Sequence, residues 1–189
     1  MSADLYLKNA RIVTEESEFQ GGVLVEDGII SQLVNGDSNI EAAETIDVQG
    51  KVLLPGLVDG HVHFNEPGRT HWEGYKTGSY AAAAGGVTTI VEMPLNATPP
   101  TISRELLAEK RETVKGKSVT DYGNLGGLVD NNLDEIKGMH KGGVCGFKAF
   151  LSNSGVDFER VDDDVLFAGL KLSKELSTVI SLHAENEYV

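Results

Sequence analysis

The 189-residue sequence predicts an α/β fold in which a small β-sandwich-like segment precedes a series of alternating strands and helices. Two observations support this prediction. Short β-type stretches separated by turn residues fill the first fifty residues, and from Leu57 onward five apolar, strand-like stretches alternate with four helix-like stretches. Such alternation is typical of parallel sheets with right-handed crossovers. The series either closes into an eight-stranded barrel or remains an open, doubly wound sheet.

The N-terminal β segment is expected to cover residues 1–54. Strand patterns occupy 5–13, 23–25, 29–34 and 46–54, with a turn at 26–28 and a polar loop over 37–44. Short antiparallel strands of this kind form a small sheet that needs a packing partner. We place the boundary of the segment near Pro55.

The second segment, residues 55–189, carries the alternating pattern. After the strand that begins at Leu57, strands are expected over 86–93, 119–129, 144–151 and 178–183, and helices over 71–84, 103–114, 133–140 and 162–176. No Gly-x-Gly-x-x-Gly opens a helix after a strand, so a dinucleotide-binding sheet has no support. A complete barrel takes roughly 250 residues, and this segment is about half of one.

Composition narrows the classes of partner. The net charge of −13 argues against nucleic acid and against an anionic membrane surface. The single cysteine, Cys145, lies in an apolar stretch and is expected to be a buried thiol in a reducing compartment. Because neither a signal peptide nor an apolar run of 18 residues is present, we expect a cytoplasmic protein without a membrane span.

A pair of histidines marks the end of the first strand of the second segment. His61 and His63 are two residues apart, so in a strand both rings project to the same face, where one metal ion can meet them. The end of a parallel strand is also where barrel enzymes keep their chemistry. The alternative is that one histidine is a hydrogen-bonded core residue and the other lies on the surface.

Two further strands contain residues that could bind a metal or another ligand. Lys148 is a lone cation in an apolar strand, where it must be paired, deprotonated or modified unless it reaches solvent. His183 places another imidazole at a strand end, where it either binds a ligand or forms a core hydrogen bond. Four ligand-type residues at the same end of three strands favour a metal site.

The motifs that contain these residues resemble those of cyclic amidohydrolases, which include dihydroorotases, dihydropyrimidinases or hydantoinases, and allantoinases. Within this family HVHFNEPGRTHWEG over 61–74 and EMPLN over 92–96 are most similar to allantoinases, and GFK over 146–148 and HAEN over 183–186 fit the same pattern. The resemblance covers essentially the whole chain. It implies the N-terminal portion of a TIM (β/α)8 barrel and hydrolysis of allantoin to allantoate in purine breakdown.

The resemblance also implies a ligand set. His61 and His63 would bind the more buried of two divalent metal ions, a carboxylated Lys148 would bridge the two, and His183 would bind the more exposed one. Zinc is the first candidate, while cobalt, manganese and nickel suit the same imidazole and carboxylate ligands. A further histidine ligand and the aspartate that acts as general base are expected beyond residue 189, so no catalytic base is assigned within the chain.

Two asparagines are candidates for substrate binding. Asn65 stands where dihydroorotases usually carry an arginine for a substrate carboxylate, and its amide suits an uncharged ureido group better. Asn96 falls one place later than the asparagine of the dihydroorotase motif, and it is equally well explained as a turn residue.

Three alternatives stay open. The chain is a piece of an allantoinase that forms a homo-oligomer when complete and is inactive in this short form, or it is part of a hydantoinase or dihydropyrimidinase. The third is a non-catalytic amidohydrolase-like protein that acts through a partner. Turnover of unsubstituted hydantoin or dihydrouracil would distinguish the second from the first.

Overall fold

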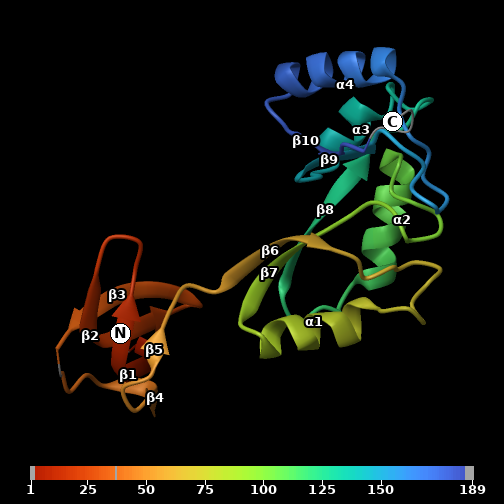
Figure 1. The fold of residues 1–189 in the computed structure, drawn as a ribbon. Helices are drawn as coiled ribbons and strands as arrows, with labels where there is room; N and C mark the ends of the chain where they lie inside the picture. The colour runs from red at the N-terminus through yellow and green to blue at the C-terminus, as the bar shows by residue number, and fades with distance from the viewer. Residues whose placement is uncertain (1–2, 37, 186–189) are drawn as a thin grey trace. The chain divides into compact units, whose positions relative to one another are not determined.

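A computed structural model describes residues 3–36 and 38–185 of the chain. The chain divides into two compact units, Met1–Pro55 and Gly56–Val189 (Figure 1). Within the described ranges, no helix has the length and apolar character needed to cross a membrane.

The first unit is a five-stranded sheet, drawn in red to orange in Figure 1. Strand β1 pairs antiparallel with β2, and β2 pairs antiparallel with β3 through a turn in which Asp27 and Gly28 both have positive φ. Tyr6, Leu24 and Val34 pack in its core. The strands are β1 (Ala3–Val13), β2 (Glu18–Glu26), β3 (Ile29–Asn35), β4 (Ala42–Asp47) and β5 (Val52–Leu53).

Two predictions for this unit are wrong in part. Strands β4 and β5 pair with β1 in parallel, whereas antiparallel strands were expected. Strand β4 also begins at Ala42, inside the expected loop over 37–44, of which Asp37 lies outside the described residues. Its residues after Ala42 are all exposed. The strand therefore depends on backbone pairing with β1, and its polar sequence gives no burial signal.

The second unit contains five parallel strands: β6 (Leu57–Val62), β7 (Val87–Glu92), β8 (Asp121–Gly127), β9 (Gly146–Phe150) and β10 (Ile180–His183). Each strand pairs with its neighbours in sequence, so the order runs from β6 to β10 without reversal. A doubly wound sheet reverses its order at a switch point. The sequential order therefore favours the barrel alternative.

Four helices connect these strands: α1 (Tyr75–Ala84), α2 (Arg104–Val114), α3 (Ile136–Lys141) and α4 (Asp163–Glu175). Helix α2 contacts α3, and α3 contacts α4, so consecutive helices pack in a row (Figure 1). A core between helices and strands forms from buried side chains that include Leu107, Met139 and Phe147.

Three local predictions for this unit need correction. Helix α1 begins at Tyr75 instead of residue 71, because Glu66 Oε2 accepts a hydrogen bond from the Tyr75 amide at 2.7 Å and satisfies the start of the helix there. Helix α3 begins at Ile136 instead of residue 133. Cys145 is exposed, not buried, because its sulfur lies over Gly123, which has no side chain to cover it.

Candidate metal centre

His61 and His63 lie together at the end of β6, as their spacing predicts. Their ring centroids are 5.3 Å apart and the ring planes are tilted by 53°. His61 is exposed and His63 is half-buried. The His61 amide donates to Asp59 Oδ1 at 3.0 Å, which fixes the backbone just before the pair. Two imidazoles in this arrangement are suited to share one cation.

His63 has a hydrogen-bond partner that orients its ring. Asn96 Nδ2 lies 3.2 Å from His63 Nδ1. With its amide oxygen turned toward the ring, Asn96 would accept a hydrogen bond from His63 Nδ1–H and leave Nε2 free for a metal. Burial lowers the pKa of His63, and the positive charges of His61, Lys148 and Lys110 lower it further. The neutral ring is therefore favoured, which is the form that binds metal.

Lys148 is buried in the middle of β9, and its side chain is only 4% exposed. Among the described residues, no carboxylate or carbonyl oxygen contacts its Nζ, which lies 4.9 Å from the ring centroid of Phe150. Burial lowers the pKa of Lys148. Its positive charge also lowers the pKa of His63. A buried amine without an anionic partner fits a lysine that becomes an anion by modification.

His183 and Lys148 both contact the ring of Phe150. The His183 ring stacks on Phe150 with centroids 4.7 Å apart. His183 Nε2 lies 3.3 Å from Glu185 Oε1, and the side chain is 43% exposed. No described contact joins His183 directly to either histidine of β6. The described contacts therefore join His61 to His63 and, separately, join Lys148 to His183 through the ring of Phe150.

Asn65, two residues after His63, is buried. It has a φ of 56°, a left-handed conformation that asparagine tolerates better than most residues. Its Nδ2 donates to Glu73 O at 3.4 Å, whereas Oδ1 is buried without a hydrogen-bond partner. An acceptor left unsatisfied in this way is costly unless a ligand supplies a donor.

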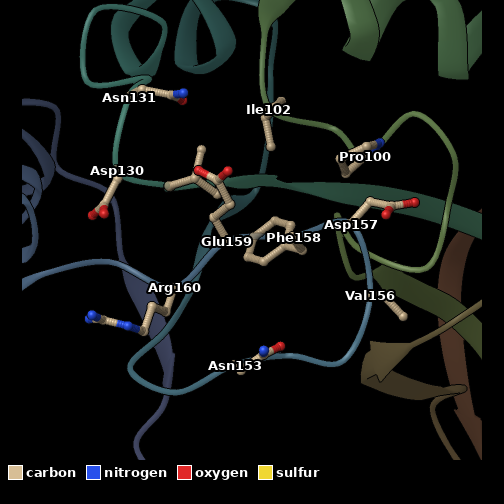
Figure 2. Close-up of a pocket in the computed structure, with 11 residues that line it drawn as sticks. Pro100, Ile102, Asp130, Asn131, Asn153, Val156, Asp157, Phe158, Glu159 and Arg160 are labelled. Atoms are coloured by element: carbon tan, nitrogen blue, oxygen red, sulfur yellow. The ribbon is translucent and has the colours of Figure 1, made fainter. Parts of the chain in front are cut away.

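Arg69, in the loop after β6, contacts the loops that follow β7 and β9. Its guanidinium donates to Asn96 O at 3.1 Å and to Asp157 Oδ2 at 2.9 Å, and it packs over Trp72. Asp157 also lines a pocket of about 820 Å³ formed by the loops after β7, β8 and β9, in which Phe158 is central (Figure 2). None of the six predicted site residues lines this pocket.

A buried polar network that contacts the loop after His63 was not predicted from the sequence. Glu92, the last residue of β7, pairs with Lys110 of α2 at 2.9 Å. Tyr75 donates to the same carboxylate and accepts from Asn124 Nδ2 at 3.0 Å. The available signal was a carboxylate at the end of an apolar strand, the same kind of signal that identified Lys148.

The described residues contain no cluster of three or more His, Cys, Asp or Glu side chains arranged to hold a metal. The three predicted histidines do not form such a cluster, because His183 has no described contact with His61 or His63, and a lysine becomes a ligand only when it is carboxylated. The two imidazoles and the unpaired buried amine nevertheless fit a metal centre. Asn186, part of the HAEN motif, lies outside the described residues.

Comparison with known proteins identifies the relatives of this chain. The sequence model of the dihydro-orotase-like family matches residues 50–189. An allantoinase from Deinococcus radiodurans is 44% identical over 100% of this chain, and an allantoinase from Salmonella choleraesuis is 40% identical over the same share. These matches confirm the predicted resemblance to allantoinases.

Solved structures show the same fold. The L-hydantoinase (dihydropyrimidinase) from Arthrobacter aurescens superposes with a TM-score of 0.92 at 35% identity and covers 99% of this chain. A dihydropyrimidinase from Brevibacillus agri superposes with a TM-score of 0.82 at 31% identity. The predicted N-terminal portion of a TIM barrel after a β segment is thereby confirmed. The chain spans only 42% of the length of the two allantoinases and of the Arthrobacter structure.

Proposed function

Because the chain belongs to the dihydro-orotase-like family, we propose that the complete protein hydrolyses the cyclic amide of allantoin and releases allantoate. The metal-dependent form of this proposal is supported by the environment of Lys148, which is buried, has no anionic partner among the described residues, and lowers the pKa of His63 by its charge. Residues 1–54 would belong to an incomplete small β domain, and residues 55–189 would supply the first five strands of the barrel.

The residues present suit a centre of two divalent metal ions, with zinc as first candidate and cobalt, manganese or nickel as others. His61 and His63 would hold one ion, His183 the other, and carboxylated Lys148 both. When bound, the ions supply Lewis acidity toward the amide carbonyl and a hydroxide nucleophile at neutral pH.

Lys148 must first be carboxylated. Burial lowers the pKa of its amine and so increases the neutral fraction. The lone pair of the neutral amine forms a bond to the carbon of CO2, and the nitrogen then loses a proton to solvent. The product is an anionic carbamate with two hard oxygen atoms.

The two asparagines are assigned different functions. The free Oδ1 of Asn65 would accept a hydrogen bond from an N–H group of the substrate, since a buried acceptor without a partner favours a ligand that donates. Asn96 would hold the ring of His63 through Nδ1, and we keep a direct substrate contact only as the weaker alternative.

A hydantoinase or dihydropyrimidinase activity is the second candidate. It is supported by the superposition on the Arthrobacter L-hydantoinase. Allantoin is favoured because the named allantoinases are 40% and 44% identical to this chain, whereas that hydantoinase is 35% identical. A cytoplasmic location and a homo-oligomer of the complete protein stay predictions.

The test compares allantoin, hydantoin and dihydrouracil as substrates of the complete, zinc-supplemented protein and of its Lys148→Ala variant. We expect allantoin to have the highest kcat/KM and the variant to lose turnover, with partial recovery when a short carboxylic acid is added. Lys137→Ala, at an exposed position, is the control. Full activity of Lys148→Ala without added acid would contradict the carbamate, and a preference for hydantoin or dihydrouracil would favour the second candidate.

A further inference from the structure

The ion pair between Glu92 and Lys110 is the most deeply buried charged contact among the described residues. The two side chains are 0% and 1% exposed, and their charged atoms are 2.9 Å apart. Glu92 comes from the end of β7 and Lys110 from α2. Replacing a buried ion pair by apolar residues is often neutral or stabilising, so stability alone does not account for this pair.

Both partners also form a hydrogen bond to the loop that follows His63. Glu92 Oε1 accepts from the Phe64 amide at 3.2 Å, and Lys110 Nζ donates to the Glu66 carbonyl oxygen at 2.7 Å. These two backbone atoms flank Asn65, which has a φ of 56°. Phe64 directly follows His63. The ion pair therefore fixes the backbone immediately after a candidate metal ligand and on both sides of a candidate substrate contact.

The carboxylate of Glu92 is itself held in place by the neighbouring elements. Tyr75 of α1 donates to Glu92 Oε2, and Asn124 of β8 donates to the Tyr75 hydroxyl at 3.0 Å. The Tyr75 ring also packs edge-on against Phe64, with centroids 5.2 Å apart. Burial raises the pKa of Glu92, whereas its three donors, Lys110 Nζ, the Tyr75 hydroxyl and the Phe64 amide, favour the ionised carboxylate. The loop after His63 thus rests on a network that leaves little freedom for its backbone.

We propose that Glu92 and Lys110 are positioning residues, which hold the loop 63–66 so that His63 and Asn65 present their side chains to metal and substrate. The link to metal and substrate rests on the proposed function, whereas the positioning of the loop does not. In other metalloproteins, removal of a residue that supports a metal ligand lowers the metal affinity about 10- to 100-fold.

The test uses three variants of the complete protein: Glu92→Gln, Lys110→Met and the double variant. In Glu92→Gln, the glutamine keeps an oxygen that can accept a hydrogen bond from the Phe64 amide. The double variant removes both buried charges, but like Lys110→Met it lacks the hydrogen bond to the Glu66 carbonyl oxygen. We measure amide hydrogen exchange of residues 61–66, the Kd for zinc by chelator competition, the absorption spectrum with cobalt, and thermal unfolding.

We expect the double variant to recover most of the stability lost in Lys110→Met. Compared with the wild type, it should still show faster amide exchange in this loop, a zinc Kd raised about tenfold or more and an altered cobalt spectrum. Met139→Ala, on the buried face of α3, serves as the destabilised control and should leave loop exchange and zinc affinity unchanged. Exchange at wild-type rates in Lys110→Met and in the double variant would overturn the proposal. Absence of zinc binding in the wild type would contradict the proposed function, and the exchange data would still decide the positioning role.

Discussion

Asn65 combines a left-handed backbone with a buried side-chain oxygen that has no partner. These two properties are separable by mutation, because glycine adopts the same φ without a side chain. We expect Asn65→Gly to preserve the fold and to raise the KM for allantoin roughly tenfold, the equivalent of one hydrogen bond of about 1.4 kcal/mol. Steady-state kinetics with circular dichroism as the folding control test this. An unchanged KM would remove Asn65 from the substrate site.

Glu66 makes stability depend on pH. Burial opposes its ionisation, but Lys117, the Tyr75 amide and Thr70 together hold its pKa below the ordinary value of 4.5. Because the folded-state pKa is lower than the unfolded one, its stabilisation is complete above about pH 4.5 and is lost as the pH falls through the folded-state value. Urea unfolding between neutral and acidic pH should show a steeper loss in wild type than in Glu66→Gln. Parallel pH curves would contradict this.

At the scale of elements, Arg69 connects the loops after β6, β7 and β9 through Asn96 and Asp157. Asp157 is 71% exposed, so the ion pair itself contributes no more than about 1 kcal/mol. Arg69→Lys keeps the charge but loses the planar fork, so we expect faster hydrogen exchange over residues 153–160 and little change in global stability. Arg11→Gln, which removes an exposed ion pair in the first unit, is the control. Unchanged exchange in Arg69→Lys would show that Arg69 does not join these loops.

Elements defined by burial could be predicted from the sequence. Strands β7 to β10 and helices α2 and α4 lie within a few residues of their expected bounds, since apolar periodicity and capping residues mark them. Strand β4 could not be predicted, because its exposed side chains carry no pattern and its partner is distant in sequence. The start of α1 depends on Glu66, a contact between residues nine positions apart.

For the candidate site, the sequence could predict single residues of a ligand type, but not the contacts that orient them. His61, His63 and Lys148 could be recognised by residue type and place in a strand. The partners that orient them could not, because Asn96 lies 33 residues from His63, and Lys110 lies 44 residues from Glu66. Such contacts depend on how the strands and helices pack.

At the scale of the whole molecule, the central proposal is that the complete protein holds two metal ions, for which carboxylated Lys148 would be a shared ligand. The most direct measurement is metal analysis of that protein by inductively coupled plasma mass spectrometry, combined with its allantoin turnover before and after chelation. We expect two divalent ions per chain, loss of turnover on chelation, recovery with zinc, and a reduced metal content in Lys148→Ala. A protein that turns over allantoin fully without bound metal would contradict this proposal.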